Sequence, residues 1–290
     1  MEIGIIGQGF VGTAIKEVFK DFHNIHAYDK FNKDKSISTN SKDINSLEDV
    51  VKKSDIIFIC VPTPMKMSTK ECDTSIVEEV VFEVDKISKD LNKKSIMILK
   101  STVPPGTILS LNQQIENFIA FSPEFLTEAN AINDFKNQNR IILGIDYIEY
   151  IDPIYEAFYK VFGDNVDYIV LSSKEAEMVK YTTNTFLATK VSFFNDIYSL
   201  CEKLNIDYDN VLKATLLDKR INESHTKVPG PDGDRGFGGH CFPKDLNALL
   251  AVADNLQITV PTLMGANITN EIVRTNKDWL EMKDRAVSDK

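Results

Sequence analysis

The chain has 290 residues, enough for one large domain or two ordinary domains with a sizeable core. Its hydrophobic content of 43% and charged content of 26% are typical of a soluble globular protein. The formal net charge of −10 argues against a general nucleic-acid-binding protein, and no apolar run approaches membrane-spanning length.

A glycine-rich motif follows the first predicted strand, an apolar run at residues 2–7 that leaves no room for a signal peptide before it. The motif has the G-x-G-x-x-G spacing of a dinucleotide-binding loop, and an amphipathic helix is predicted after it. The first glycine makes the tight turn, the second admits a pyrophosphate, and the third allows close helix packing. The residues expected to contact the cofactor here are Gly7, Gly9, Phe10, Val11 and Gly12.

A second strand is predicted at residues 25–28, and Asp29 follows it. A carboxylate at this position accepts hydrogen bonds from an adenosine ribose and disfavours a 2′-phosphate, so NAD is the expected cofactor. Lys30 keeps some use of NADP open. The alternative is a glycine turn in an unrelated α/β protein.

Strands and helices continue to alternate along the first half of the chain. Helices are predicted at 73–89 and 148–162, and further strands at 55–61, 95–99, 118–121, 140–144 and 167–171. This order predicts a Rossmann-type, doubly wound parallel sheet in a domain of residues 1–172. Ligands of such sheets bind beyond the carboxyl ends of the strands, where Thr63, Thr102 and Glu124 fall.

The second half, residues 173–290, is predicted to be an all-α domain that begins with a long central helix at 172–204. Further helices are expected at 209–217, 244–255 and 261 to about 283, and residues 279–290 are expected to be a frayed, polar helix end. Lys180 and Asn184 are four residues apart and share one helix face. A solvated lysine and a chance asparagine are the alternative interpretation.

The segment 236–245 places Cys241 after a glycine turn and before Lys244 and Asp245. A nearby cation and a helix N-terminus, indicated by Pro243, both favour the nucleophilic thiolate. A buried, inert cysteine is the alternative. The four cysteines are widely spaced without a disulfide or metal pattern, so no metal is expected and a reducing cytoplasm is favoured.

Seven motifs in order resemble the UDP-glucose/GDP-mannose dehydrogenase family, the nucleotide-sugar 6-dehydrogenases. They extend to about Asn276, and the loop from Val228 to Gly239 is most similar to that of members acting on UDP-glucose. The matching stretches are residues 7–12, 61–64, 72–75, 100–106 and 122–128, Lys180 with Asn184, and residues 236–245.

The resemblance implies an NAD-dependent oxidation of a sugar C6 alcohol to a carboxylate through a thiohemiacetal and a thioester on Cys241. Glu124 would assist hydrolysis of the thioester, Thr102 and Asp245 would position the water, and Lys180 and Asn184 would stabilise the oxyanion. Cofactor contacts would also include Asp29, Lys30, Thr63, Thr102 and Glu128. The implied contacts to the nucleotide sugar are Glu124, Phe125, Leu126, Glu128, Lys180, Asn184, Arg235, Phe237, Gly238 and Gly239.

Relatives dimerise through the central helix, so the resemblance also implies a homodimer in which Arg235 reaches the neighbouring subunit. Family members normally continue into a second Rossmann-like domain that contributes to the sugar site, and residues 1–290 are expected to lack it. Three alternatives follow: a minimal enzyme completed by a partner, an enzyme with a smaller substrate, or a homologue that binds NAD without turnover. A 6-phosphogluconate or 3-hydroxyacid type dehydrogenase, which needs no thiol, is a further alternative.

Overall fold

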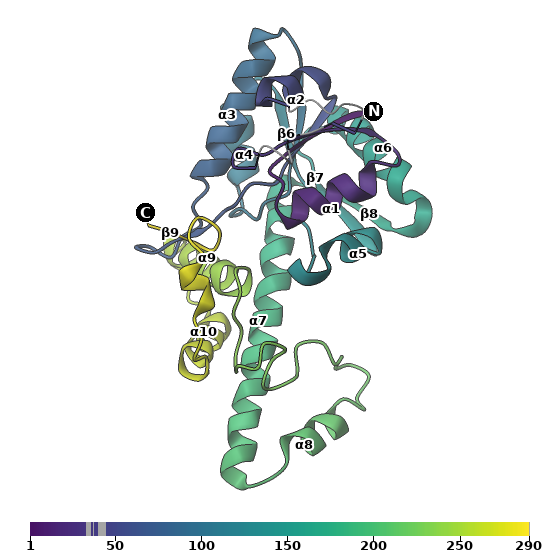
Figure 1. Ribbon diagram of the computed structural model, residues 1–290. Coiled ribbons are helices and arrows are strands. Elements are labelled where there is room, and N and C mark those ends of the chain that lie inside the picture. The colour runs from purple at the N-terminus through teal and green to yellow at the C-terminus, as the bar shows by residue number, and fades with distance from the viewer. Residues whose placement is uncertain (33–35, 37, 40–44, 290) are drawn as a thin grey trace. The chain divides into compact units, whose positions relative to one another are not determined.

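The computed structural model describes residues 1–32, 36, 38–39 and 45–289 in two compact units (Figure 1). Unit 1 comprises Met1–Thr63 and Thr74–Lys180, and unit 2 comprises Pro64–Asp73 and Tyr181–Lys290. The division therefore falls within the long central helix rather than at 172/173. It also assigns residues 64–73 to the C-terminal unit, although the sequence placed them in the N-terminal domain.

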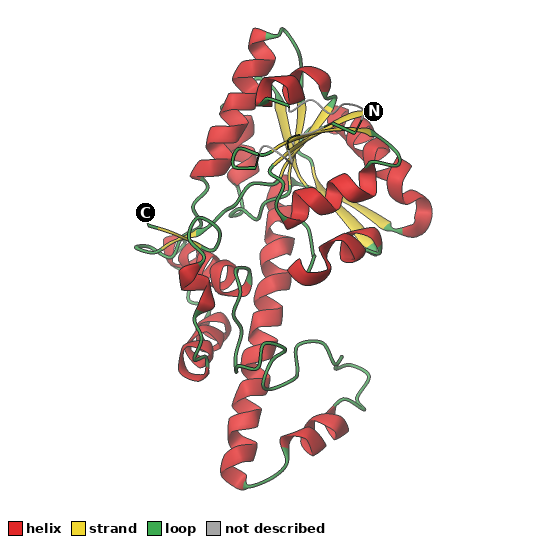
Figure 2. Ribbon diagram, in the orientation of Figure 1, coloured by secondary structure: helices red, strands yellow, loops and turns green. Residues whose placement is uncertain are grey.

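Unit 1 is built on a seven-stranded sheet in the order β2-β1-β3-β5-β6-β7-β8, drawn as yellow arrows in Figure 2. All neighbouring pairs are parallel except β6 and β7, which pair antiparallel through Phe121 and Gly144. The predicted doubly wound sheet is thus confirmed. Its strands are β1 (Glu2–Ile6), β2 (Asn24–Tyr28), β3 (Ile56–Ile59), β5 (Ile96–Leu99), β6 (Phe118–Phe121), β7 (Arg140–Gly144) and β8 (Asp167–Leu171).

Helices cover both faces of this sheet (Figure 1). Alternate strand residues enter two different hydrophobic clusters: Phe58 and Ile98 lie in one, and Ile57 and Met97 lie in the other. Burial on both faces explains why the strands are continuous apolar runs. The helices are α1 (Phe10–Phe19), α2 (Leu47–Lys53), α3 (Ser75–Asp90), α4 (Thr107–Asn112), α5 (Ala131–Lys136) and α6 (Ile151–Phe162).

Short helical segments complete unit 1. The predicted helix at 148–162 begins as a 3₁₀ turn, Ile148–Tyr150, before α6. Two further 3₁₀ turns span Glu128–Asn130 and Gly163–Asn165. The sequence analysis missed α2, although Ser46 and Asp49 form a capping box at its start.

Unit 2 consists mainly of helices, and a two-stranded parallel sheet accompanies them. The long helix α7 (Ser173–Leu204) contributes its first eight residues to unit 1 and the remainder to unit 2. The other helices are α8 (Tyr208–Thr215), α9 (Phe242–Asn255) and α10 (Pro261–Val273), and the strands are β4 (Met65–Lys66) and β9 (Val287–Ser288).

The prediction for the C-terminal segment was wrong. Helix α10 ends at Val273, where the next residue, Arg274, is extended, and a 3₁₀ turn follows at Asp278–Glu281. Trp279 is buried with Met65 and Val287, because β9 pairs with β4. An apolar cluster therefore stabilises residues that the sequence analysis assigned to a frayed helix end. Among the described residues, no helix is long and apolar enough to cross a membrane.

The buried indole of Trp279 gives a first prediction. Its side chain is 5% exposed, so Trp279→Ala removes a large apolar surface from a small cluster. We expect the free energy of unfolding to fall by about 3 kcal/mol, measured by urea denaturation. Leu280→Ala is the control, because Leu280 is 39% exposed and its truncation should change stability far less. Equal losses in both variants would contradict the packing described above.

Candidate active site

The glycine loop of unit 1 has the geometry that a dinucleotide requires. Gly7 has a φ of +88°, and a methyl group there would lie 2.6 Å from the carbonyl oxygen of Cys60. A methyl group on Gly12 would lie 1.9 Å from the carbonyl oxygen of Gly7. At Gly9, the residue before α1, a methyl group would meet no atom within 4 Å. The fold therefore needs glycine at 7 and 12, while Gly9 leaves space for a pyrophosphate at the helix N-terminus.

Asp29 links the end of β2 to this loop. Its Oδ2 accepts a hydrogen bond from the Gln8 amide at 2.7 Å, and its Oδ1 accepts from the amides of Phe31 and Asn32. The adjacent Lys30 forms an exposed ion pair with Glu79 at 3.0 Å. Contact of Asp29 or Lys30 with a cofactor stays a prediction.

Three predicted site residues lie just after neighbouring strands of the sheet. Thr63, Thr102 and Glu124 follow β3, β5 and β6, and all three are buried. Parallel strands end at the same edge, so these residues belong to the carboxyl edge of the sheet. Glu128, by contrast, is exposed at the start of a 3₁₀ turn.

A buried ion pair joins α7 to the segment after β6. The Lys180 ammonium lies 2.9 Å from Glu124 Oε1 and also donates to the Glu124 carbonyl oxygen. Glu124 Oε2 accepts from the Leu126 amide at 2.7 Å. The Phe125 ring lies 5.3 Å from the Lys180 ammonium and also stacks on Arg140. Substitution of either Lys180 or Glu124 alone would leave an uncompensated buried charge, so neither residue can be replaced singly without a large loss of stability.

Lys100 is a buried group for which the sequence analysis assigned no role. Its ammonium donates to the Ser122 hydroxyl at 3.0 Å and to the Pro123 carbonyl at 3.1 Å, so it ties the end of β5 to that of β6. Burial lowers the pKa of Lys100 to about 8. Burial also raises the pKa of the nearby Cys60 thiol to about 12. The sequence does contain a signal for this buried lysine, because Lys100 directly follows the apolar strand β5.

Cys241 lies at the start of α9 in unit 2, as predicted. It occupies the N-cap position, and Pro243 stands within the first helical turn. Its environment includes Lys244. Burial is the largest influence and opposes the charged form of Lys244, but the Asp245 carboxylate together with Cys72 and Cys241 raises the pKa of this lysine overall. A helix N-terminus and a charged lysine both favour a thiolate.

Asp245 is the common partner in this part of unit 2. One of its oxygens pairs with Lys244, and the other accepts a hydrogen bond from the Asn184 amide group at 2.5 Å. Asn184, Lys244 and Asp245 are all buried. Burial raises the pKa of a second thiol nearby, Cys72, to about 11. All four cysteines lie within the described residues, and each carries a thiol.

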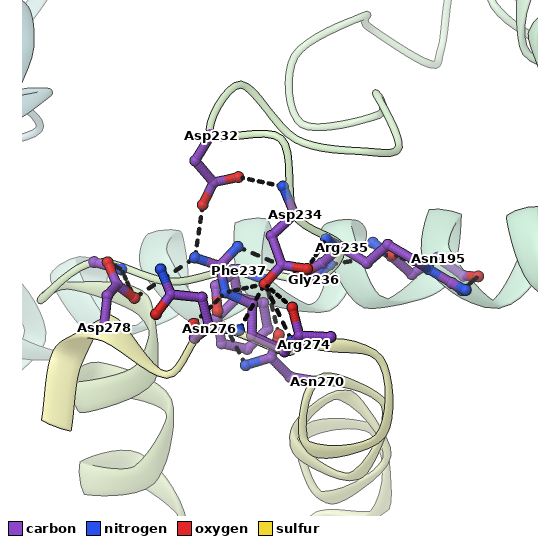
Figure 3. A network of polar contacts seen from close by, with 12 residues as sticks. Asn195, Asp232, Asp234, Arg235, Gly236, Phe237, Asn270, Arg274, Asn276 and Asp278 are labelled. Atoms are coloured by element: carbon purple, nitrogen blue, oxygen red, sulfur yellow. Dashed lines mark hydrogen bonds and ion pairs between the residues drawn. The ribbon is translucent and has the colours of Figure 1, made fainter.

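A polar network fixes the loop that precedes Cys241 (Figure 3). The side chain of Arg274 is 1% exposed and pairs with three carboxylates. It lies 2.6 Å from Asp232 and 3.5 Å from both Asp234 and Asp278. Asp278 in turn accepts a hydrogen bond from the Gly239 amide at 3.1 Å. The residues that follow α10 thus hold the backbone two positions before the cysteine.

The same loop approaches α10 closely enough to require glycine. Asn270 accepts from the Phe237 amide at 2.7 Å and donates to the Phe237 carbonyl at 3.1 Å (Figure 3). A methyl group on Gly236 would lie 2.3 Å from Asn270 Oδ1, and one on Gly238 would lie 2.2 Å from Arg274 Nη2. The sequence analysis named these glycines but missed Asn270, Arg274 and Asp278, which carry no local motif.

Arg235 lies along α7 of its own chain. Its guanidinium stacks on Tyr198 at 4.9 Å and donates to the Asn195 carbonyl at 3.2 Å. It also hydrogen-bonds the Ser199 hydroxyl and pairs with Glu202. A reach into a neighbouring subunit stays a prediction, and in this chain it would require these contacts to break.

Unit 2 contains a pocket of about 780 Å³ next to this loop. Three predicted substrate contacts, Phe237, Gly238 and Gly239, line the pocket together with Phe242, the first residue of α9. His225 and Lys227 also line it, and burial lowers the pKa of His225, so this imidazole is neutral near pH 7.

The predicted catalytic residues are divided between the units. Unit 1 contains Thr102, Glu124 and Lys180, and unit 2 contains Asn184, Cys241 and Asp245. Within the described part of the chain, no group of three or more His, Cys, Asp or Glu side chains could hold a metal ion.

Two family models match the chain. The NAD binding domain of the UDP-glucose/GDP-mannose dehydrogenase family matches residues 26–162, and the central domain of that family matches residues 174–272. UDP-glucose 6-dehydrogenase of Rickettsia bellii is 37% identical over 79% of this chain and 50% of its own length. UDP-glucose 6-dehydrogenase of Rickettsia typhi is 31% identical over 96% of this chain and 67% of its own length. The chain thus spans between half and two thirds of these relatives.

Solved structures agree with these matches. A UDP-glucose dehydrogenase from Pyrobaculum islandicum has a TM-score of 0.81 and 28% identity, and the match covers 93% of this chain and 68% of that one. A 3-hydroxyisobutyrate dehydrogenase from Mycobacterium tuberculosis has a TM-score of 0.71 at 16% identity and covers 93% of both chains, a similarity of fold alone.

The Arg274 network gives a second prediction. Arg274→Ala leaves three partly exposed carboxylates without their shared cation, so we expect a loss of about 2–3 kcal/mol in the free energy of unfolding, measured in urea. Arg220→Ala is the control, because this exposed arginine pairs only with Asp218 among the residues described, and its loss should cost less than about 1 kcal/mol. A stability change in Arg274→Ala as small as that of the control would refute the inferred role.

Proposed function

Because the chain belongs to the UDP-glucose/GDP-mannose dehydrogenase family, we propose that it oxidises the C6 alcohol of a nucleotide sugar to a carboxylate. The proposed substrate is UDP-glucose and the proposed product is UDP-glucuronate. The matches of both family models confirm the predicted resemblance, and the match to the NAD binding domain confirms NAD as the cofactor. The observation that carries the proposal is the position of Cys241 at the N-terminus of α9, within a chain that matches both domains.

The proposed reaction consumes one alcohol, two NAD⁺ and one water, and yields a carboxylate, two NADH and three protons. NAD⁺, when bound, supplies the acceptor for each hydride, and the residues proposed to hold it are those of the glycine loop with Asp29. The open space at Gly9 supports this assignment, since a side chain there would fill the place of the pyrophosphate.

We assign the covalent step to Cys241. After the first oxidation its thiolate attacks the aldehyde carbon, a C–S bond forms, and the carbonyl oxygen becomes the oxyanion of a thiohemiacetal. The second oxidation gives a thioester. Water then attacks the thioester carbon, the C–S bond breaks, and the thiolate leaves. The charged Lys244 and the N-terminus of α9 support a thiolate at this position.

Each proposed oxyanion donor, Lys180 or Asn184, has one more polar hydrogen than its described hydrogen bonds use. The Lys180 ammonium has three donors and uses two of them on Glu124. Asn184 has two amide hydrogens and donates one of them to Asp245. Both side chains are buried and held by these partners, and fixed donors of this kind are effective at stabilising an oxyanion.

For hydrolysis of the thioester we propose that Glu124 acts as the base toward the water, which Thr102 and Asp245 position. For the sugar we propose contacts from Glu128 and Arg235 and from the Phe237–Gly239 segment that lines the pocket of unit 2. Phe125 and Leu126 are the remaining residues proposed to contact the nucleotide sugar. None of these roles requires a metal ion.

We also propose a homodimer formed through α7. Phe186, Phe193 and Leu200 are exposed on this helix and recur every seven residues, which places them along one side of it. Apolar side chains in such a row are typical of a helix that packs against another helix.

The test of the reaction is NADH release with UDP-glucose and GDP-mannose, for the wild type and for Cys241→Ser. We expect turnover with a nucleotide sugar in the wild type, and loss of the carboxylate product with accumulation of aldehyde in the serine variant, because serine lacks the thiolate. Cys201→Ser is the matched control, since Cys201 is a buried thiol in another cluster and should leave turnover unchanged.

Two outcomes would contradict this proposal. NAD binding without turnover of any nucleotide sugar, alone or with a partner chain, would favour a homologue that only binds the cofactor. Full turnover in Cys241→Ser would favour a 3-hydroxyacid type dehydrogenase, which needs no thiol.

The dimer is tested separately. Phe193→Glu places a charge in the apolar row on α7, so we expect the mass measured by light scattering after gel filtration to fall from dimer to monomer. Leu217→Glu is the control, because Leu217 is more exposed but lies outside α7 and should leave the mass unchanged. A monomeric wild type, or equal effects of both substitutions, would exclude this interface.

A further inference from the structure

Glu177 is the most deeply buried carboxylate on α7, with a relative exposure of 0%, and the proposed mechanism gives it no role. Its two oxygens accept hydrogen bonds from two different backbone amides. Oε2 accepts from Gly106 at 2.5 Å, and Oε1 accepts from Ile108 at 2.8 Å. These amides belong to the start of α4, about 70 residues earlier in the chain, so the contact is tertiary and lies entirely within unit 1.

The amides that Glu177 binds close the loop that carries Thr102. At the start of this loop, the Ser101 hydroxyl donates to the Val61 carbonyl at 2.6 Å. Pro104 and Pro105 follow and have no N–H to donate. Gly106 is therefore the first residue after Thr102 and Val103 whose amide can anchor the loop. Its φ is +101°, and it provides no side chain to cap α4. Glu177 supplies the missing acceptor.

Both contacts require the ionised carboxylate. A protonated carboxyl group turns one oxygen into an O–H donor and a weak acceptor, and glutamine replaces that oxygen with an NH₂ donor, so in both forms one of the two amides loses its charged acceptor. Burial opposes ionisation and raises the pKa of Glu177 to about 7, although the amides of Ile108 and Gly106 act in the opposite direction.

Two other charges act on Glu177. Asp146, in the segment after β7, raises its pKa, and Lys174, one turn earlier on α7, lowers it. The α4 segment Thr107–Asn112 has no titratable side chain. Proton uptake at this site therefore depends mainly on Glu177 itself.

We propose that Glu177 is a positioning residue for the Thr102 loop: its carboxylate fixes the loop at Gly106 and Ile108, and protonation releases one of these two amides. The effect on catalysis rests on the proposed function, because it acts through Thr102. The structural effect does not depend on that function.

Amide hydrogen exchange, followed by NMR between pH 5.5 and 8.5, tests the contact without turnover. After correction for the intrinsic pH dependence of exchange, we expect wild-type protection of Gly106 or Ile108 to fall at least tenfold as the pH drops through about 7. In Glu177→Gln the same amide should exchange rapidly at every pH, as in the protonated wild type.

Glu175→Gln is the matched control. Glu175 lies two residues away on α7, is exposed, and accepts from the Ser172 amide, so its substitution should leave Gly106 and Ile108 unchanged. Protection of both amides that is constant from pH 5.5 to 8.5 in the wild type would overturn the proposal. The wild-type titration decides this point even if Glu177→Gln does not fold.

A kinetic measurement distinguishes positioning from general stability. We expect wild-type kcat to decrease below about pH 7, and kcat of Glu177→Gln to be lower and flat over the same range, because the variant is locked in the released form. If kcat of Glu177→Gln still falls below about pH 7 as in the wild type, that fall belongs to another titrating group. This result would overturn the proposed effect of Glu177 on catalysis. Absence of turnover in the wild type would contradict the proposed function but leave the amide result valid.

Discussion

Two buried lysines of the described residues are each compensated by a carboxylate, and the candidate chemistry depends on that constraint. Lys180 is buried against Glu124, and Lys244 against Asp245. Each of these pairs costs solvation energy that its own Coulomb attraction and hydrogen bonds must offset. The consequence is geometric: the partners cannot move apart without exposing an uncompensated charge to a low-dielectric interior. Side chains that would otherwise be flexible, such as lysine, are therefore held in one orientation.

The contrast among the cysteines follows from the same constraint. Burial raises the pKa of Cys60 and of Cys72 and keeps both protonated, although Lys100 acts on the first thiol and Lys244 on the second. What distinguishes Cys241 is its place at the N-cap of a helix, where the helix N-terminus acts in addition to the charge of Lys244. Asp245 thus affects the thiol through Lys244, without any need for direct contact. This indirect effect explains why the order Cys, Phe, Pro, Lys, Asp is chemically meaningful.

The inner strands of the sheet could be predicted from the sequence because they are buried on both faces, whereas the edge strand β8 is largely exposed. Each strand is an apolar run bounded by polar or turn residues, and β6, β7 and β8 begin and end where that pattern predicts. Short helices such as α4 were missed because their stability comes from tertiary contacts, here the carboxylate of Glu177, rather than from a local signal. The glycine loop and the Cys241 segment were found because the functions proposed for them require adjacent residues in one order.

The partners of those motifs could not be predicted in the same way. Asn270 and Asp278 lie more than 30 positions from the backbone groups they bind, Arg274 is as far from Asp232 and Asp234, and nothing near them in the sequence indicates these contacts. The predicted helix through residues 274–283 was wrong for the same reason: hydrogen bonds from residues 274–276 to the loop of Asp234 outweigh local helix propensity.

The close packing of Gly236 and Gly238 against Asn270 and Arg274 has an evolutionary consequence. A side chain at position 238 would have to displace a guanidinium that holds three carboxylates, so the glycine and the arginine form one inherited unit. Loss of the arginine alone would not relieve the requirement for glycine, because a methyl group at position 238 would also lie 2.5 Å from Asp278 Oδ1. Substitutions at positions 238, 274 and 278 should therefore be correlated across descendants of a common ancestor, although the first two lie 36 positions apart in the chain.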